Sequence, residues 1–181
     1  MKTNEQLGQP VGSGEVRLIR YLPGPIERVW DFLTDPEKRA RWFAGGPIEP
    51  RKGGTITLNF RNANLGPGET PPDGAKEFHD PGASMAGTIT RWEPPHVLAY
   101  TFGETGESLV TFELSVEGAN VRLVLTHRAT GEDLPYLPGF AAGWHTHLAH
   151  LLSLLEGTPR PPFWPMHARL REQYARILGA S

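Results

Sequence analysis

The chain of 181 residues contains no cysteine. This absence excludes disulfides, thiolate metal sites and cysteine nucleophiles. Neither charge sign dominates, because 18 basic and 20 acidic residues leave a formal net charge of -2. No apolar run approaches the roughly 18 residues that a membrane span requires, and the polar N-terminus lacks the apolar core of a signal peptide. We therefore expect a cytoplasmic protein with neither a nucleic acid nor a membrane as partner.

Several catalytic motifs are also absent. The chain has no G-x-S-x-G nucleophile motif, and Gly53-Gly54 precedes a strand rather than a helix, so it is no phosphate-binding loop. Basic residues between 17 and 41 are interleaved with acidic ones, which is typical of a solvated face rather than a nucleic-acid footprint. The sequence thus predicts no catalytic residue and no cofactor, and it favours a binding protein over an enzyme.

What the chain does contain is a clear order of elements. Alternating apolar residues predict strands at 15–21, 54–60, 84–92, 97–102, 108–116 and 121–127. Short helices are expected after Pro25 and after the capping sequence Asp35-Pro36-Glu37. Longer amphipathic helices are expected at 138–156 and 164–178. Because the connections at 93–96 and 117–120 are too short for a crossover helix, the strands are antiparallel. The expected fold is α+β, with a curved antiparallel sheet wrapped around the long C-terminal helix and one extra helix after it.

This order predicts three parts. Residues 1–13 show no periodicity and are expected to form a flexible arm, residues 14–156 form the domain, and residues 157–181 form a linker and a helix. The apolar stripe of that last helix, Met166, Leu170, Tyr174 and Ile177, must pack on the domain or on a second subunit, which leaves a homodimer open. The segment 61–83 is rich in proline and glycine, and it is either a disordered surface insertion or a flap over a pocket.

Five short motifs follow one another along residues 14–156. They are Pro25 to Trp30, Thr34-Asp35-Pro36-Glu37 with Arg41-Trp42-Phe43, Gly87-x-Ile89 leading to Trp92-Glu93-Pro94-Pro95, Val121–Leu125 with Thr126-His127-Arg128, and Gly143-Trp144 with its leucines. In this order they resemble the START-like (SRPBCC, helix-grip) superfamily. Within it, the chain is most similar to homologues of the activator of the ninety-kilodalton heat-shock protein ATPase.

The resemblance implies a fold that serves binders, cyclases, hydrolases and co-chaperones. The eukaryotic co-chaperone carries an additional N-terminal domain that drives client binding, for which this chain has no room. We therefore do not expect a heat-shock chaperone as partner.

Three histidines on the long helix suggest a metal site at first sight, but their spacing argues against one. His145 and His147 lie about 200° apart around the helix axis and cannot share an ion. His147 and His150 could share one, but no carboxylate or thiolate neighbours them. We expect no metal, with His147 at the margin of the apolar stripe and His150 pointing to water.

The candidate ligand-binding residues follow from strand phase and from the stripe of the long helix. His127 continues the inward phase of its strand, and Arg91 follows Met85, Gly87 and Ile89. An inward histidine and arginine could orient a ligand carboxylate or carbonyl; the alternative is a hydrogen-bonded rim residue or a salt bridge. The full candidate set is Trp30, Trp42, Phe43, Arg91, Phe102, Phe112, His127, Trp144, His147, Leu148 and Leu151. The aromatic members serve equally well as plain core.

These observations favour non-catalytic binding of a small hydrophobic molecule in a cavity between the sheet and the long helix. One alternative is an enzyme of cyclase or hydrolase type that uses the same cavity, with His127 as acid–base group. Another is a co-chaperone-like activator of a heat-shock ATPase. A buried histidine–acid pair at the mouth would favour the enzyme, and a cavity closed by side chains would favour the co-chaperone. The sequence does not specify the ligand.

Overall fold

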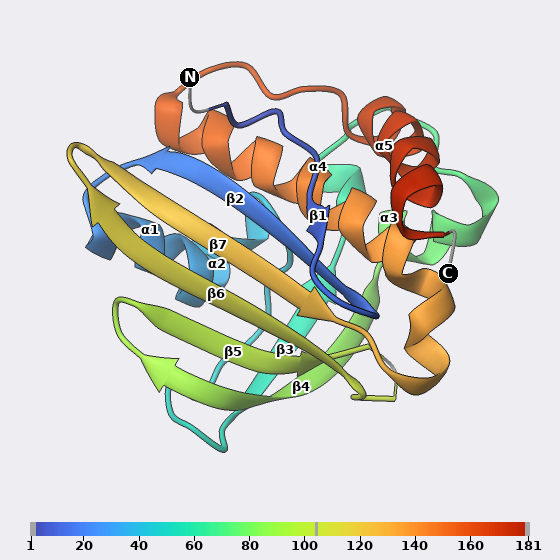
Figure 1. The fold of residues 1–181 in the computed structure, drawn as a ribbon. Coiled ribbons are helices and arrows are strands. Elements are labelled where there is room, and N and C mark those ends of the chain that lie inside the picture. Colours follow the sequence, from blue (N-terminus) through green and yellow to red (C-terminus); the bar gives the residue numbers. More distant parts are fainter. Residues whose placement is uncertain (1–2, 104, 180–181) are drawn as a thin grey trace.

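The computed structural model describes residues 3–103 and 105–179. A single seven-stranded sheet curves around a long helix, in the spatial order β1-β2-β7-β6-β5-β4-β3 (Figure 1). All neighbouring strands are antiparallel. The prediction of an α+β helix-grip fold is confirmed.

The strands are β1 (Gln9–Pro10), β2 (Glu15–Pro23), β3 (Thr55–Phe60), β4 (Ala83–Glu93), β5 (Val97–Phe102), β6 (Ser108–Glu117) and β7 (Asn120–Arg128). The α-helices are α1 (Ile26–Thr34), α2 (Pro36–Ala40), α3 (Lys76–His79), α4 (Leu137–Glu156) and α5 (Phe163–Leu178). Three 3-10 turns complete the list, η1 (Asn62–Asn64), η2 (Asp73–Ala75) and η3 (Gly131–Tyr136). The predicted strands and long helices agree with these bounds to within one or two residues.

Local signals in the sequence explain where the helices start and stop. The Asp35 carboxylate accepts hydrogen bonds from the backbone N–H groups of Glu37 and Lys38, at 3.0 and 2.9 Å, so it caps α2 as expected. At the other end of the domain, α4 terminates at Gly157, whose φ of 71° is the left-handed conformation that glycine adopts without strain.

The hydrophobic core lies between the concave face of the sheet and α4. Alternate residues of β2, β6 and β7 point into it, and Leu148 and Leu151 of α4 meet them with no exposed surface. Figure 1 shows α4 crossing the sheet diagonally, with α1 and α2 at one end. Burial of this one continuous apolar cluster is the main stabilising contribution to the fold.

The N-terminal residues expected to form a flexible arm carry β1, which pairs with β2 through Gln9 and Arg17. The Asn4 side chain accepts a hydrogen bond from the backbone N–H of Tyr21 and donates one to its carbonyl, at 2.7 and 2.9 Å. Such side-chain mimicry of a strand partner leaves no periodic pattern, so it could not be predicted from residue alternation.

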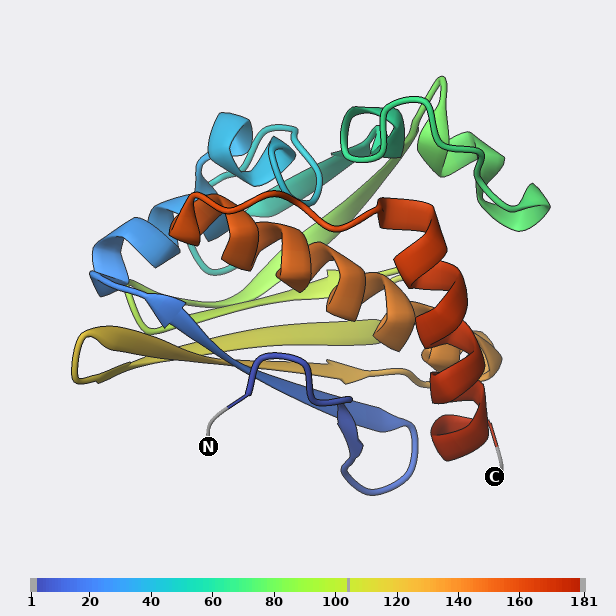
Figure 2. The ribbon, with the colours of Figure 1, turned by 90° about the horizontal axis from the view of Figure 1, so that it is seen from above.

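The C-terminal helix α5 packs on α4 of the same chain (Figure 2). Its Leu170 and Tyr174 are buried there, and the Tyr174 hydroxyl accepts a hydrogen bond from the backbone N–H of Gly8 at 2.7 Å. Ile177 remains 41% exposed. The stripe on α5 is thus largely covered without a second subunit.

The segment between β3 and β4 folds into η1, η2 and α3 and lies beside the start of α5 (Figure 2). Glu69 fixes this contact, because its carboxylate accepts hydrogen bonds from the backbone N–H groups of Phe163 and Trp164, at 3.0 and 2.7 Å. These groups are free donors at the first turn of α5, so the insertion caps that helix.

Candidate ligand-binding cavity

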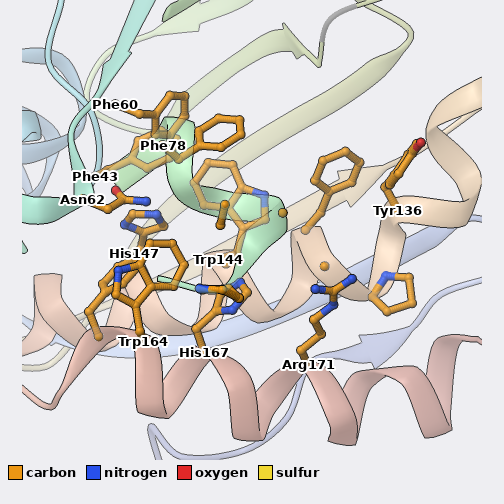
Figure 3. Close-up of a pocket in the computed structure, with 18 of the residues that line it drawn as sticks. Phe43, Phe60, Asn62, Phe78, Tyr136, Trp144, His147, Trp164, His167 and Arg171 are labelled. Carbon is orange, nitrogen blue, oxygen red and sulfur yellow. The ribbon is translucent and has the colours of Figure 1, made fainter. Parts of the chain in front are cut away.

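A cavity of about 470 Å³ lies at the N-terminal half of α4, where α4, the insertion after β3 and α5 come together (Figure 3). Its inner wall, its α4 wall and its outer wall are described in turn below. The deeper half of the fold, around the C-terminal half of α4, is closed core.

The inner wall is aromatic and belongs to the sheet and to the segment after α2. Phe43, Phe60 and Phe102 line it together with Met85. Phe43 packs edge-on against Phe60 with ring centroids 5.2 Å apart. Its segment is fixed by the buried Arg39, whose Nε donates to the Ala44 carbonyl at 2.8 Å. The aromatic wall is therefore preformed by hydrogen bonds outside the cavity.

The α4 wall owes its space to glycine. Gly139 and Gly143 both line the cavity, and a Cβ added at either position would meet no other atom within 4 Å. Phe140 and Trp144, which directly follow these two glycines, also line the cavity, with Trp144 4.7 Å from Phe43 by ring centroids. Because these two positions on one turn of α4 have no side chain, a gap remains that the neighbouring elements do not fill.

The outer wall consists of α5 and the insertion. Trp164 of α5 donates from Nε1 to Nδ1 of His79 at 2.9 Å, and Phe78 of α3 packs on Phe60 with ring centroids 5.4 Å apart. Together with the Glu69 cap, these contacts hold the insertion over the cavity. Residues 61–83 were expected to be either a disordered surface insertion or a flap over a pocket. In the structure this insertion is folded and forms one wall of the cavity.

His147 presents a hydrogen-bond acceptor to the cavity. Its Nδ1 donates to the Trp42 carbonyl at 2.8 Å, because a carbonyl can only accept. Burial lowers the pKa of His147 to about 3, so the ring is neutral at pH 7. The proton is then on Nδ1, and Nε2 carries a lone pair.

Four of the sequence candidates line this cavity: Phe43, Phe102, Trp144 and His147. Five others are buried in the closed core instead: Trp30, Trp42, Phe112, Leu148 and Leu151. Leu148 and Leu151, which were expected to line the cavity, therefore do not. Both lie further along α4 in the core cluster, and β2 is the strand that packs most extensively on this helix.

His127 faces inward, as its strand phase predicts, but it is placed as a structural group. Its Nδ1 accepts a hydrogen bond from Nε1 of Trp144 at 2.9 Å, and its ring stacks on Phe140 with centroids 4.7 Å apart. Burial lowers its pKa to about 3. Among the described residues it forms no ion pair with a carboxylate. This arrangement positions Trp144 and is poorly suited to proton transfer near neutral pH.

Two placements from the sequence are incorrect. Arg91 is exposed and its Nε pairs with the Glu93 carboxylate at 2.8 Å, because a bulge between Ile89 and Arg91 shifts the strand phase. Trp92 points inward instead, against Trp30. His150, expected to point to water, has no exposed surface, because the start of α5 covers that side of α4 and Phe163 contacts its ring.

The sequence candidates do not include the outer wall. Asn62, Phe78, Trp164, His167 and Arg171 all line the cavity, and none was predicted. The one available signal was the amphipathic pattern of α5, which showed that this helix packs but not which cavity it borders. The insertion carries no periodic pattern at all.

No group of three or more histidine or acidic side chains in the described part of the chain could hold a metal ion. None of the described helices is long and apolar enough to cross a membrane.

The family model described as Activator of Hsp90 ATPase homolog 1-like protein matches residues 23–156. The chain belongs to this family. Its place in the START-like superfamily, predicted from the five motifs, is thereby confirmed. The match ends with α4, so α5, which builds half of the outer wall, lies beyond the part that the family model matches.

Solved structures extend the likeness beyond that match. A protein of Bordetella parapertussis, solved by NMR in solution, is 41% identical, with 98% of this chain and 96% of that one covered and a TM-score of 0.78. CalU16 from Micromonospora echinospora is 26% identical, with 92% and 89% covered and a TM-score of 0.66. DynU16, a protein in the dynemicin biosynthetic locus, is 20% identical, with 84% and 51% covered and a TM-score of 0.64, and shows the fold alone. No curated protein matches the chain.

Proposed function

We propose that this domain binds a small, mainly apolar molecule in the cavity beside α4 and does not transform it chemically. The observation that carries the proposal is the space left open at Gly139 and Gly143 between aromatic walls. Its volume of about 470 Å³ falls within the range of small-molecule pockets. An apolar ligand would remove the exposed aromatic faces of this space from water, which favours binding.

The two alternatives have less support. For an enzyme, His127 would have to transfer protons, but its one lone pair is used by Trp144 and its pKa of about 3 keeps it neutral. For a co-chaperone, the family description refers to activation of the Hsp90 ATPase. A closed interior would have favoured that role, whereas the interior contains an open cavity. We also propose that the protein binds its ligand in the cytoplasm.

A thermal-shift experiment tests the proposal. A panel of fatty acids, fused aromatic compounds and isoprenoids is added to wild-type protein, and unfolding is followed by circular dichroism. A ligand present at about 100 times its Kd stabilises the native state by about 2.7 kcal/mol, which raises Tm by several degrees for a domain of this size.

Gly143→Leu gives the decisive comparison, because its side chain enters the open space. It should keep a cooperative transition and lose the ligand-induced shift. Ala168→Leu is the matched control, since Ala168 is exposed on α5 and does not line the cavity; it should retain the shift. An equal shift in Gly143→Leu and wild type would show that any binding occurs elsewhere.

A further inference from the structure

The cavity lining contains no acidic side chain. Its polar members are one arginine, two histidines, one asparagine and one tyrosine, with neither aspartate nor glutamate. Figure 3 shows Asn62 and His147 at one end, Arg171 at the other, and Trp144 between them. A ligand that spans the cavity therefore meets different polar chemistry at its two ends.

The first end is closed and offers one acceptor. His147 is 6% exposed, with Nδ1 committed to the Trp42 carbonyl, so its Nε2 is an acceptor. Asn62 lies at the same end, but its Oδ1 has almost no accessible surface. A ligand group that donates a hydrogen bond, such as a hydroxyl, would pair with Nε2 of His147.

The second end is open and cationic. Arg171 is exposed at the cavity margin and forms no ion pair among the described residues. His167, one turn before it on α5, also lines the cavity. The pKa of His167 is lowered to about 4, mainly by burial and to a smaller extent by the positive charge of Arg171. At pH 7 the guanidinium of Arg171 is thus the formal charge that borders the cavity. A carboxylate is its natural partner, through two parallel hydrogen bonds.

We propose that the ligand is an aromatic or polycyclic carboxylate that carries a hydroxyl group at the end opposite its carboxylate. The carboxylate pairs with Arg171 at the mouth, the ring system lies against Trp144 and Phe43, and the hydroxyl donates to Nε2 of His147 at the closed end. This inference rests on the proposed function and names the class of molecule that the same cavity takes.

Matched probes separate these contributions in the wild-type protein. The parent probe is a hydroxybiphenyl carboxylic acid with its two polar groups at opposite ends, compared with its methyl ester and its methyl ether by isothermal titration calorimetry. We expect the parent to bind best, with the ester and the ether each weaker by about threefold to tenfold, since the ester loses the ion pair and the ether loses the hydrogen bond to His147.

Variants assign each loss to its residue. Arg171→Gln should weaken binding of the acid about threefold to tenfold and leave binding of the ester unchanged. Arg169→Gln makes the same charge change on the same helix outside the cavity lining, and should leave both unchanged. His147→Phe should abolish the preference for the hydroxyl compound over its ether. If His147→Phe does not fold, the comparison of hydroxyl compound and ether on wild-type protein decides that point.

The outcomes distinguish this inference from the proposal beneath it. Ester and ether that bind as tightly as the parent, with Arg171→Gln indistinguishable from wild type, would overturn the ligand class and leave apolar binding intact. Absence of binding by all three probes, together with no thermal shift across the apolar panel, would overturn both.

Discussion

The two halves of α4 have opposite roles, although they lie on one continuous helix over one sheet. In the C-terminal half, Leu148, Leu151 and Leu155 fill the space beneath them and are at most 5% exposed. In the N-terminal half, Gly139 and Gly143 leave that space open. Core and container therefore differ here first by the side chains at a few helical positions.

A second difference is what covers each half. The C-terminal half faces the strands directly, whereas the N-terminal half borders a cavity closed on its outer side by α5 and the insertion. Those two segments are joined by Glu69 and by the Trp164–His79 hydrogen bond. The cavity thus depends on contacts between parts of the chain about 85 to 95 residues apart.

The largest expected effect is a loss of stability in the closed half. Leu148→Ala should lower the free energy of unfolding by about 2–5 kcal/mol, because it leaves a void among residues that cannot collapse. Urea denaturation followed by tryptophan fluorescence measures it. A change below about 1 kcal/mol would mean that the C-terminal half is also loosely packed, and the contrast between the two halves would be lost.

The next effect concerns pH and the buried His150, which has no hydrogen-bond partner for either ring nitrogen among the described residues. Burial lowers its pKa from 6.5 to about 4. Below pH 6.5 His150 is protonated in the unfolded chain but stays neutral in the folded protein. The free energy of unfolding therefore falls as the pH drops from 6.5 towards 4, by at most about 1.4 kcal/mol per pH unit for this group.

His150→Leu should remove this contribution. Denaturation midpoints at pH 8, 6 and 5 should decline less steeply for the variant than for wild type, and the variant should be no less stable at pH 8, since a partnerless polar ring has been replaced by an apolar side chain. Parallel pH profiles for the two proteins would indicate that His150 is accessible to water.

A smaller effect is expected where the two outer segments meet. Glu69→Ala removes the acceptor for two N–H groups at the start of α5 and should cost about 0.5–2 kcal/mol. Hydrogen exchange should rise in residues 62–79 and in the first turn of α5, with β6 and β7 unchanged. Glu69→Gln, which keeps one acceptor oxygen, should fall between Glu69→Ala and wild type. Uniform loss of protection across the sheet would contradict this local role.

The smallest effect has the opposite sign. Gly143→Ala adds a methyl group where no atom lies within 4 Å and removes a helical glycine, so it should raise the free energy of unfolding by up to about 1 kcal/mol. The same denaturation assay measures it beside Leu148→Ala. Destabilisation by Gly143→Ala would show that the cavity wall is tighter than its geometry indicates.

The sequence predicted the parts of this protein that follow a regular period. Strand alternation, the Asp35 cap and the stripe of α4 were enough for the helix-grip fold, because each repeats or sits at a fixed offset. Phase errors came from single events: one bulge moved Arg91 to the surface, and one covering helix buried His150. The periodicity of apolar residues predicts neither a bulge within a strand nor a helix that packs over another helix.

The candidate site was harder to predict, for a related reason. Phe102, Trp144 and His147 were found because they belong to periodic elements, and Phe43 was found as an aromatic side chain in the segment after α2. The glycines of α4 were not among the candidates, although their missing side chains create the space. Arg171 and Asn62 reach the cavity through contacts between distant segments, which no local pattern reveals.

The central claim, that the N-terminal half of α4 borders a container for a small molecule, is tested most directly by native mass spectrometry. Wild-type protein, Gly143→Leu and Ala168→Leu would be purified from the organism that encodes the chain and sprayed under identical gentle conditions. Wild type and Ala168→Leu should carry the same additional small-molecule mass, and Gly143→Leu should not. Identical masses for wild type and Gly143→Leu, whether both empty or both loaded, would contradict the account.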